Sequence, residues 1–318
     1  MKTLRMGVLG TADIARTVIA ASHNCHHGRI TAVASRDPEK ARRFAAQTGL
    51  EQHFGSYEAL LHSGQVDCIY LPLPNSLHAP WALRCLEAGL PVLVEKPLTI
   101  DPADAQALLD ASHRTSLAMA EGFMYRFHPL YQRLKELMAA GAIGRVCSLS
   151  GVFTFMLDDA GENPNSASLG GGALLDVGCY PIDAFRVLLG GQPLEVTCRA
   201  VMQGVDRAVM GILRYPGEVL AFFEAGIFQY ERHGLAIHGT LGSLTVADPW
   251  IPGDRDVDIL LRQEGQPPRT ITVAGANAYT LELDDFFLAA AGLKPPRFPL
   301  EDSVANTEIL NRCRQQME

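Results

Sequence analysis

The sequence predicts a chain that begins with a doubly wound α/β domain and continues as an α+β part. Over the first 120 residues, strand-like and helix-like segments alternate, which is typical of a parallel sheet built from βα units. The strand-like runs are apolar throughout, as expected where helices cover both faces of a sheet. After residue 123 the alternation ends and strand-like segments follow one another.

The first part contains five strand-like runs with helix-like stretches such as PEKARRFAAQTG and HAPWALRCLEAG between them. The expected strands cover 5–10, 30–35, 68–74, 91–97 and 117–123.

The second part opens with a helix-like stretch that ends at Gly141. A strand-like stretch over 144–155 and a loop rich in Gly, Asn, Ser and Pro over 158–172 follow, and a second helix runs to RVLLGG. Successive strand-like segments between 193 and 274 predict an antiparallel sheet of six or more strands. Two helix-like stretches close the chain, about 279–291 and 302–316.

Composition narrows the class of protein. A length of 318 residues suits two domains, and 47% hydrophobic residues supply enough material for packed cores. A net charge of −8 without a basic run argues against nucleic acid or an anionic membrane as partners. No signal peptide, membrane span or metal site is predicted, because no long apolar segment occurs and the adjacent residues His23 to His27 cannot easily wrap one ion. Seven scattered cysteines without a C-x-x-C pair predict reduced thiols and a cytoplasmic protein.

The stretch GTADIA, residues 10–15, follows the first strand-like run, where a dinucleotide-binding turn would lie. Gly10 keeps the first glycine of the usual G-x-G-x-x-G pattern, which allows the tight turn, whereas Ala12 and Ala15 replace the other two. Alanine is an accepted substitute at the third position, and a helix N-terminus still offers N–H groups to a pyrophosphate. A plain strand–turn–helix explains the same residues, so this stretch alone leaves both interpretations open.

The second expected strand ends in Ser35 and Arg36, followed by Asp37. Asp37 and the proline after it fit the start of a helix, with the aspartate as N-cap. An NAD site prefers an acidic residue at this strand tip, whereas a guanidinium pairs with the 2′-phosphate of NADP. The pattern therefore favours NADP(H), with Asp37 as an alternative ribose ligand.

Two further strand ends carry polar residues. LPLPNSLH, residues 71–78, predicts a loop at the carboxyl edge of the sheet, where ligands bind in open α/β folds, or simply a loop leading into a helix. VLVEKPL places Glu95 and Lys96 at the tip of a buried strand that faces the same edge. A lysine beside a nicotinamide could hold and protonate a substrate oxygen, although most loop lysines are only solvated.

The stretch GGGALLDVGCYPIDAFRVLLG, residues 170–190, places Asp176, Tyr180 and Asp183 on one face of a helix. Such a stripe among apolar residues fits either a functional site or a solvated face. Pro181 indicates a helix start or a kink near Tyr180.

In this order along the chain, these stretches resemble the glucose–fructose oxidoreductase / inositol dehydrogenase family (Gfo/Idh/MocA). The resemblance spans essentially the whole chain and rests on GTADIA, PNSLH, VLVEKPL, GFMYRFHPLYQRLKELMAAGAIGRV and GGGALLDVGCYPID. Because members with G-T-A-x-I-A occur in this family, the resemblance implies that GTADIA is a working dinucleotide-binding turn.

The resemblance implies a Rossmann domain over 1–123 and a substrate-binding and oligomerisation domain over 124–318, with a large open-faced antiparallel sheet and a final helix that packs back on the first domain. Lys96 matches the main catalytic residue, and Asp176 the carboxylate that orients substrate and lysine. Position 180 is histidine in the inositol dehydrogenase branch; Tyr180 is similar to the dimeric dihydrodiol dehydrogenase and NADP-dependent xylose dehydrogenase branch. This difference points to a sugar, polyol or vicinal diol as substrate.

The residues expected to hold the cofactor belong to the strand ends and the loops that follow them. They are Gly10, Thr11, Ala12, Asp13, Ile14, Ser35, Arg36, Leu71, Pro72, Asn75, His78, Glu95 and Lys96. The role of Arg126, in the matching motif of the second part, stays open. NADP(H) is the expected cofactor and NAD(H) the alternative.

The expected reaction moves a hydride between the cofactor and a substrate carbon while Tyr180 or Lys96 takes the hydroxyl proton. Both groups have a pKa of about 10 when free, so their surroundings must lower the pKa of the one that takes the proton. Two other functions fit the same motifs: a non-catalytic sugar or cofactor sensor, and an NAD-dependent glycoside hydrolase. Strand-like segments with apolar residues on both faces, such as 219–228, predict a homo-oligomer, most simply a dimer formed through the open sheet.

Overall fold

The computed structural model describes residues 2–157 and 165–317, so part of the expected loop over 158–172 lies outside the described residues. The chain forms two compact units. The first comprises the residues up to Met124 together with Tyr279–Val304, and the second comprises Tyr125–Ala278 with the residues from Ala305 onward. The sequence interpretation placed all residues after 123 in the second part, whereas Tyr279–Val304 belongs to the first unit.

Six parallel strands form the sheet of the first unit, in the order β3-β2-β1-β4-β5-β6. The direction of strand addition reverses between β1 and β4, and ligands of open α/β sheets bind at such a switch point, beyond the carboxyl ends of the strands. The strands are β1 Leu4–Leu9, β2 Gly28–Ala34, β3 Gln52–Phe54, β4 Cys68–Leu71, β5 Val92–Glu95 and β6 Met119–Gly122.

Helices cover both faces of this sheet, which explains why its strands are apolar throughout. Helices α3 (Tyr57–Leu61), α4 (His78–Glu87) and α5 (Pro102–Thr115) pack on one face. Helices α1 (Asp13–Ser22), α2 (Pro38–Thr48) and α8 (Ala278–Ala290) pack on the other.

Helix α8 joins the first unit through its apolar side chains. Leu283, Phe286 and Phe287 are almost fully buried in the same core as Val8 and Val33. Burying each such side chain contributes about 1.5–3 kcal/mol, which holds this late segment on the sheet formed by the first part of the chain.

Eight strands form the sheet of the second unit, in the order β14-β13-β12-β11-β7-β10-β9-β8. The expectation of a purely antiparallel sheet is corrected in one place, because β7 and β10 pair in parallel. The strands are β7 Val146–Met156, β8 Glu195–Gln203, β9 Val205–Tyr215, β10 Val219–Gly226, β11 Phe228–Gly239, β12 Gly242–Val246, β13 Val257–Gln263 and β14 Arg269–Val273.

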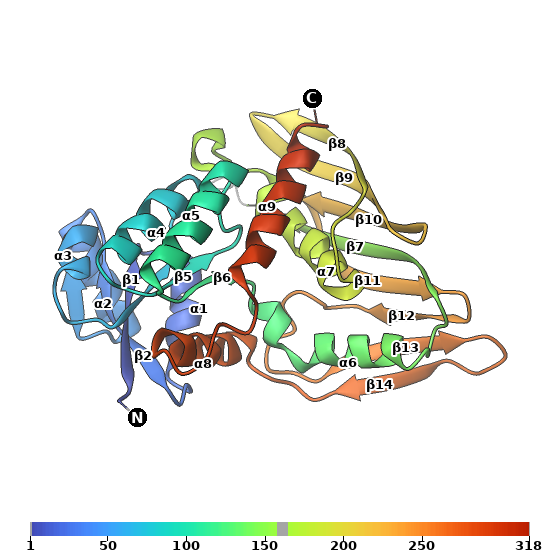
Figure 1. Ribbon diagram of the computed structural model, residues 1–318, viewed down its shortest axis with the longest axis horizontal. Coiled ribbons are helices and arrows are strands. Elements are labelled where there is room, and N and C mark those ends of the chain that lie inside the picture. The colour runs from blue at the N-terminus through green and yellow to red at the C-terminus, as the bar shows by residue number, and fades with distance from the viewer. Residues whose placement is uncertain (1, 158–164, 318) are drawn as a thin grey trace. The chain divides into compact units, whose positions relative to one another are not determined.

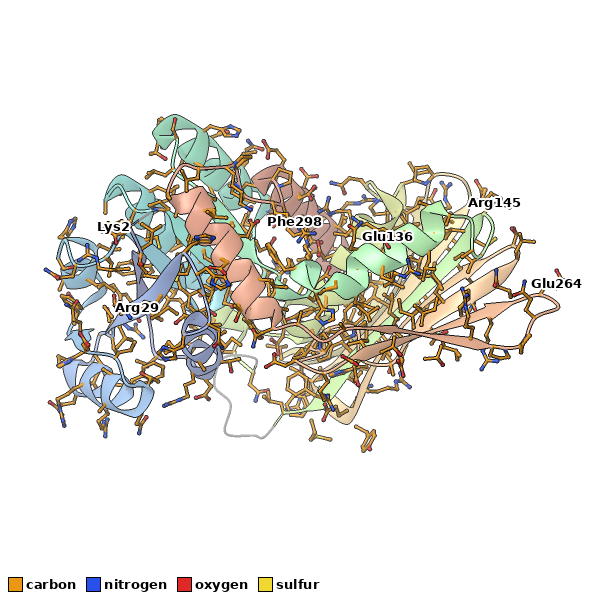
Figure 2. The ribbon with its side chains drawn as sticks, turned by 90° about the horizontal axis from the view of Figure 1, so that it is seen from below. Lys2, Arg29, Glu136, Arg145, Glu264 and Phe298 are labelled. Carbon is orange, nitrogen blue, oxygen red and sulfur yellow. The ribbon has the colours of Figure 1, made fainter. Side chains whose placement is uncertain are left out.

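Helix α7 (Cys179–Leu189) lies against β7 and β10, and helix α6 (Pro129–Ala139) lies against β14 (Figure 1). In Figure 2, Glu136 marks helix α6 and Glu264 the turn between β13 and β14. Gly151 of β7 gives α7 room, because a Cβ there would lie 2.6 Å from Pro181. The last helix is α9 (Leu300–Arg314).

The other face of this sheet carries large apolar side chains that are exposed. Along β10, Ala221 and Phe223 are buried while the alternate residues Leu220 and Phe222 are about half exposed, at 46% and 54%. Ile212 of β9 pairs directly with Phe222 and is 51% exposed. Alternate residues of a strand point to opposite faces, so these side chains form one open apolar surface.

Candidate active site

The first unit brings most of the predicted cofactor residues to one edge of its sheet. Strands β1, β2, β4 and β5 are parallel, so their carboxyl ends lie together. Gly10 follows β1, Ser35 follows β2, Pro72 follows β4, and Lys96 follows β5. The residues selected on separate segments of the sequence therefore share one edge.

The turn after β1 requires glycine at its first position only. Gly10 has φ +104°, and a Cβ there would lie 2.9 Å from the Leu73 side chain. Ala12 has an ordinary extended backbone and precedes α1, and Ala15 is fully buried in the core beneath the helix. Alanine is thus accommodated at both positions where the usual pattern has glycine.

Asp37 caps helix α2, as the sequence predicted. Its carboxylate accepts hydrogen bonds from the amides of Glu39 and Lys40 at 2.9 and 3.2 Å. Ser35 is buried, and its hydroxyl accepts a hydrogen bond from the Asp37 amide at 3.2 Å. Arg36 is exposed beside them, and burial raises the pKa of Tyr57 although the nearby charge of Arg36 opposes the rise.

His78 has a different role from the one the resemblance implied. Its side chain is fully buried, with Nδ1 2.8 Å from the Pro97 carbonyl oxygen and Nε2 2.7 Å from the Leu73 carbonyl oxygen. Burial lowers its pKa to about 4, outweighing the two carbonyl acceptors that favour the charged ring. A side chain enclosed by main-chain partners does not reach a cofactor, so His78 joins two loops instead.

Lys96 is half-buried at the end of β5. Its amide donates a hydrogen bond to Glu95 Oε2 at 3.3 Å, and Glu95 Oε1 accepts one from the Tyr70 hydroxyl at 2.6 Å. Glu95 was predicted to bind the cofactor, but the structure engages both of its carboxylate oxygens within the first unit.

Asp176 lies in a π-helical turn, η4 (Leu174–Gly178), directly before α7. The buried Asp206 side chain anchors the start of this turn by accepting a hydrogen bond from the Leu174 amide at 2.7 Å. Gly172 is required here, because its φ is +116° and a Cβ would collide with the Asp206 carboxylate. The helical segment continues from this turn into α7, which begins at Cys179, so Pro181 lies in the first turn of α7, where the π-helical stretch gives way to α-helix.

Tyr180 is 6% exposed and lies among aromatic rings, which rules out a solvated stripe at this position. Its ring centroid lies 5.9 Å from that of Tyr125, 5.2 Å from Phe153 and 6.3 Å from Trp250. These partners come from segments distant in sequence, so the spacing along the helix could not reveal them.

The structure assigns a partner to Arg126. Its guanidinium donates two hydrogen bonds to the carboxylate of Asp183, one of them from Nε at 2.7 Å, and both side chains are buried. The Tyr125 hydroxyl donates to the same carboxylate. The third member of the predicted stripe is therefore a buried ion that fixes Tyr125 beside Tyr180.

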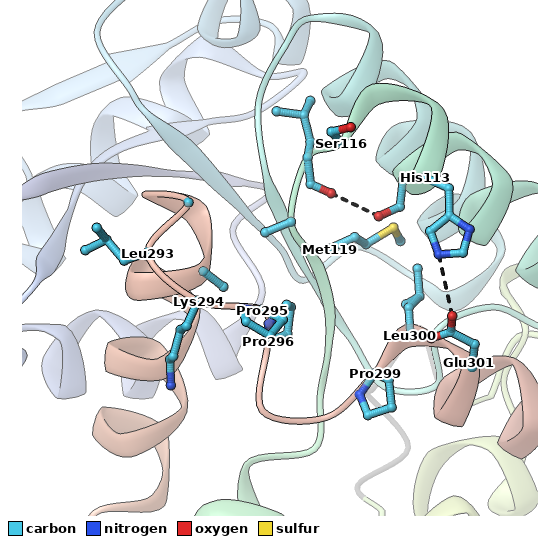
Figure 3. A pocket seen from close by; sticks show the side chains of 15 residues that line it. His113, Ser116, Met119, Leu293, Lys294, Pro295, Pro296, Pro299, Leu300 and Glu301 are labelled. Carbon is cyan, nitrogen blue, oxygen red and sulfur yellow. Dashed lines mark hydrogen bonds and ion pairs between the residues drawn. The ribbon is translucent and has the colours of Figure 1, made fainter.

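A cavity of about 600 Å³ lies elsewhere in the first unit, and none of the predicted site residues lines it (Figure 3). It is formed by the end of α5, the start of β6 and the loop between α8 and α9. His113 Nε2 lies 3.5 Å from Glu301 Oε1 on its wall. Within residues 2–157 and 165–317, no group of three or more His, Cys, Asp or Glu side chains is arranged to hold a metal ion.

Comparison with known families identifies the class of protein. Residues 4–123 match the model of an oxidoreductase family with an NAD-binding Rossmann fold, and residues 131–245 match the GFO/IDH/MocA C-terminal domain. The chain belongs to the Gfo/Idh/MocA family, as its motifs indicated. In the described part of the chain, no helix is long and apolar enough to cross a membrane.

Two relatives belong to the branch that Tyr180 indicated. The chain is 34% identical to D-xylose 1-dehydrogenase (NADP(+)) 2 of Haloferax volcanii, over 99% of this chain and 98% of that protein. It is 30% identical to trans-1,2-dihydrobenzene-1,2-diol dehydrogenase of Xenopus tropicalis, over 91% of this chain and 90% of the relative.

A solved structure is similar over the whole chain. A 3-ketoreductase from Actinomadura kijaniata, crystallised with NADP and TDP-benzene, superposes with a TM-score of 0.93 at 29% identity. The match covers 100% of this chain and 98% of that one. Structures of this reductase with a lysine replaced by alanine or glutamate, and with a tyrosine replaced by phenylalanine, are similar to this chain as well.

Proposed function

We propose that this protein is an NADP(H)-dependent oxidoreductase that transfers a hydride between the nicotinamide and a hydroxyl or carbonyl carbon of a sugar or vicinal diol. The observation that carries this function is the convergence of the Gly10 turn, Arg36 and Lys96 on one edge of a parallel sheet, in a chain of this family. The NADP-linked relatives support it.

The first unit fits a dinucleotide. Gly10 forms the tight turn after β1 with φ +104°, and the N-terminus of α1, whose N–H groups suit a pyrophosphate, follows directly. Arg36 is the exposed cation at the end of β2, and Asp37 directs its carboxylate into the helix cap. These residues would hold the pyrophosphate and the 2′-phosphate respectively. When bound, NADP(H) supplies or accepts the hydride.

Lys96 and Tyr180 handle the proton of the reacting oxygen. A lysine ammonium donates hydrogen bonds to a substrate oxygen, and a phenol hydroxyl donates or accepts the proton. The spacing in the related 3-ketoreductase supports this assignment, because its substituted lysine and tyrosine are 84 positions apart, as Lys96 and Tyr180 are here. Asp176, at the start of the same helical segment, orients the substrate and the lysine.

A substrate panel tests the proposed function and selects the substrate class. Aldoses and vicinal diols are offered with NADP⁺, and nucleotide-linked keto sugars with NADPH, while the near-ultraviolet absorbance of the reduced cofactor is followed. We expect turnover with one of these three classes. No absorbance change with any of them, by protein that binds NADPH, would contradict an oxidoreductase and favour a sensor.

Arg36 should determine the cofactor preference. Wild-type protein is expected to bind NADPH more tightly than NADH, and Arg36→Ala should weaken NADPH by about 1–3 kcal/mol, the range for a hydrogen bond to a charged group. Binding is measured by calorimetry. Arg42→Ala is the matched control, because Arg42 is an exposed arginine of the adjacent helix paired with Glu39. Equal affinities of the wild type for the two cofactors would refute the preference.

We also propose that the open apolar face of the second sheet forms a homodimer interface. Phe222, Ile212, Leu220 and Met210 are each about half exposed on adjacent strands, and large exposed apolar surfaces usually mark interaction sites. In a two-fold dimer this surface of one copy packs against the same surface of the other, so both apolar faces are buried together.

The assembly should respond to charge placed on this face. Light scattering of wild-type protein at micromolar concentration should give twice the chain mass, and the double variant Ile212→Asp/Phe222→Asp should give the mass of one chain. Leu293→Asp is the control, because Leu293 is 60% exposed on the first unit and should leave the mass doubled. A wild-type mass of one chain would refute the interface.

A further inference from the structure

The main chain from Lys96 to Leu98 is held at three points by side chains rather than by strand pairing. Glu95 Oε2 accepts from the Lys96 amide at 3.3 Å, and His78 Nδ1 lies 2.8 Å from the Pro97 carbonyl oxygen. Glu121 Oε1, on β6, accepts from the Leu98 amide at 2.7 Å. The backbone that carries the Lys96 side chain is therefore set by buried or half-buried groups from β5, α4 and β6.

Tyr70 holds the Glu95 carboxylate, the group that accepts the hydrogen bond from the Lys96 amide. It is 1% exposed on β4, and its hydroxyl donates to Glu95 Oε1 at 2.6 Å. Tyr70 pairs with Leu93 across the strands, so Glu95, two residues further along β5, projects from the same face. Gly122 lies opposite Glu95 on β6.

The charges around Glu95 couple its ionisation to Lys96. Burial raises the pKa of Glu95 above its usual value, and the Tyr70 hydrogen bond and the positive charge of Lys96 limit this rise. On the side of α8, Glu282 and Tyr279 face Tyr70, whose own pKa is raised well above its usual value by burial and by Glu95. The Tyr70 hydroxyl thus donates and keeps its proton, which favours the charged carboxylate next to Lys96.

We propose that Tyr70 is a positioning residue for Lys96, acting through the carboxylate of Glu95. This inference rests on the proposed function, in which Lys96 handles the proton of the reacting oxygen. With Tyr70 in place, the charged Glu95 holds the Lys96 amide and offsets the ammonium charge. Without the hydroxyl, Glu95 becomes protonated more readily. The neutral carboxyl then accepts a weaker hydrogen bond from the Lys96 amide and no longer offsets the ammonium charge.

Tyr70→Phe tests this role with little change in volume. We expect kcat to fall about tenfold or more, as for loss of a hydrogen bond to a charged group, with the affinity for NADPH little changed. Because the lost hydrogen bond raises the pKa of Glu95, the acid limb of the kcat/KM profile should move to higher pH. Glu95→Gln, which preserves size and removes the charge, should abolish that limb. Tyr215→Phe is the control, because Tyr215 is equally buried and lies in the second unit.

A double mutant separates positioning from a general loss of structure. If Tyr70 acts through Lys96, Tyr70→Phe should cost almost nothing further in a Lys96→Met background. The same fold loss in both backgrounds, or an unshifted pH profile, would overturn the inference. If Lys96→Met is slow while Tyr70→Phe and Glu95→Gln behave like wild type, the inference fails and the proposed function stands. If Lys96→Met itself turns over normally, the inference and the role proposed for Lys96 both fail, whereas the oxidoreductase function stands.

Discussion

Lys96→Met should lower kcat by about 10²–10⁴, the usual contribution of general acid–base catalysis, and Tyr180→Phe should lower it by a similar factor. Methionine keeps much of the lysine side-chain length without the charge, and phenylalanine removes only the hydroxyl. The double variant should lose much less than the product of the two factors, because residues that act as a unit are not additive. Steady-state kinetics on the substrate selected by the panel measures all three variants.

Two controls separate this result from general damage. Lys294→Met removes a lysine that pairs with Asp285 at the cavity of Figure 3, and Tyr230→Phe alters a tyrosine that is 89% exposed. Both should turn over like wild type, and NADPH should bind Tyr180→Phe with unchanged affinity. If Tyr180→Phe reaches the wild-type rate on the true substrate, the phenol has no part in proton transfer and Lys96 acts with Asp176.

The second large effect concerns stability. Arg126→Met should destabilise the protein by about 3–5 kcal/mol, because it leaves the fully buried Asp183 carboxylate without its main charged partner. Arg186 lies 3.8 Å from the same carboxylate and offsets only part of the loss. Urea denaturation measures the change as a shift of the unfolding midpoint.

An exposed ion pair supplies the comparison. Arg133 pairs with Glu136 on the surface of α6, and Arg133→Met should cost less than about 1 kcal/mol. Replacing both buried partners, as Arg126→Met/Asp183→Leu, should recover part of the stability, because no buried charge is then left unpaired. Equal losses for Arg126→Met and Arg133→Met would show that the buried pair contributes no more than a surface pair.

Much of the first unit could be predicted because its signals are local. The apolar runs at 5–10 and 30–35 became β1 and β2, and Asp37 with its following proline marked the start of α2. Strand β3, Gln52–Phe54, was missed because it is only three residues long, two of them polar, and so shows no hydrophobic periodicity. The parallel pairing of β7 with β10 was missed as well, since sequence pattern does not encode strand direction.

The site residues also differ in whether a local signal in the sequence could predict their place. Strand-end positions correctly placed Gly10, Arg36 and Lys96 at one edge of the sheet, because the carboxyl ends of parallel strands lie together. His78 was misassigned, since its burial between the Leu73 and Pro97 carbonyls depends on two loops that meet only in the fold. Asp206 and Tyr70 went unnoticed, because their partners are 32 and 25 positions away and each looks like an ordinary strand residue.

Stoichiometry during a single complete conversion tests the central claim most directly. The protein is mixed with excess substrate from the class that the panel selects and a limiting amount of NADP(H), and product and cofactor are quantified together. An oxidoreductase converts one cofactor for each product formed, so conversion should stop when the cofactor is consumed. Product that keeps accumulating with no net change of the cofactor would contradict the account and indicate a hydrolase that recycles its bound nucleotide.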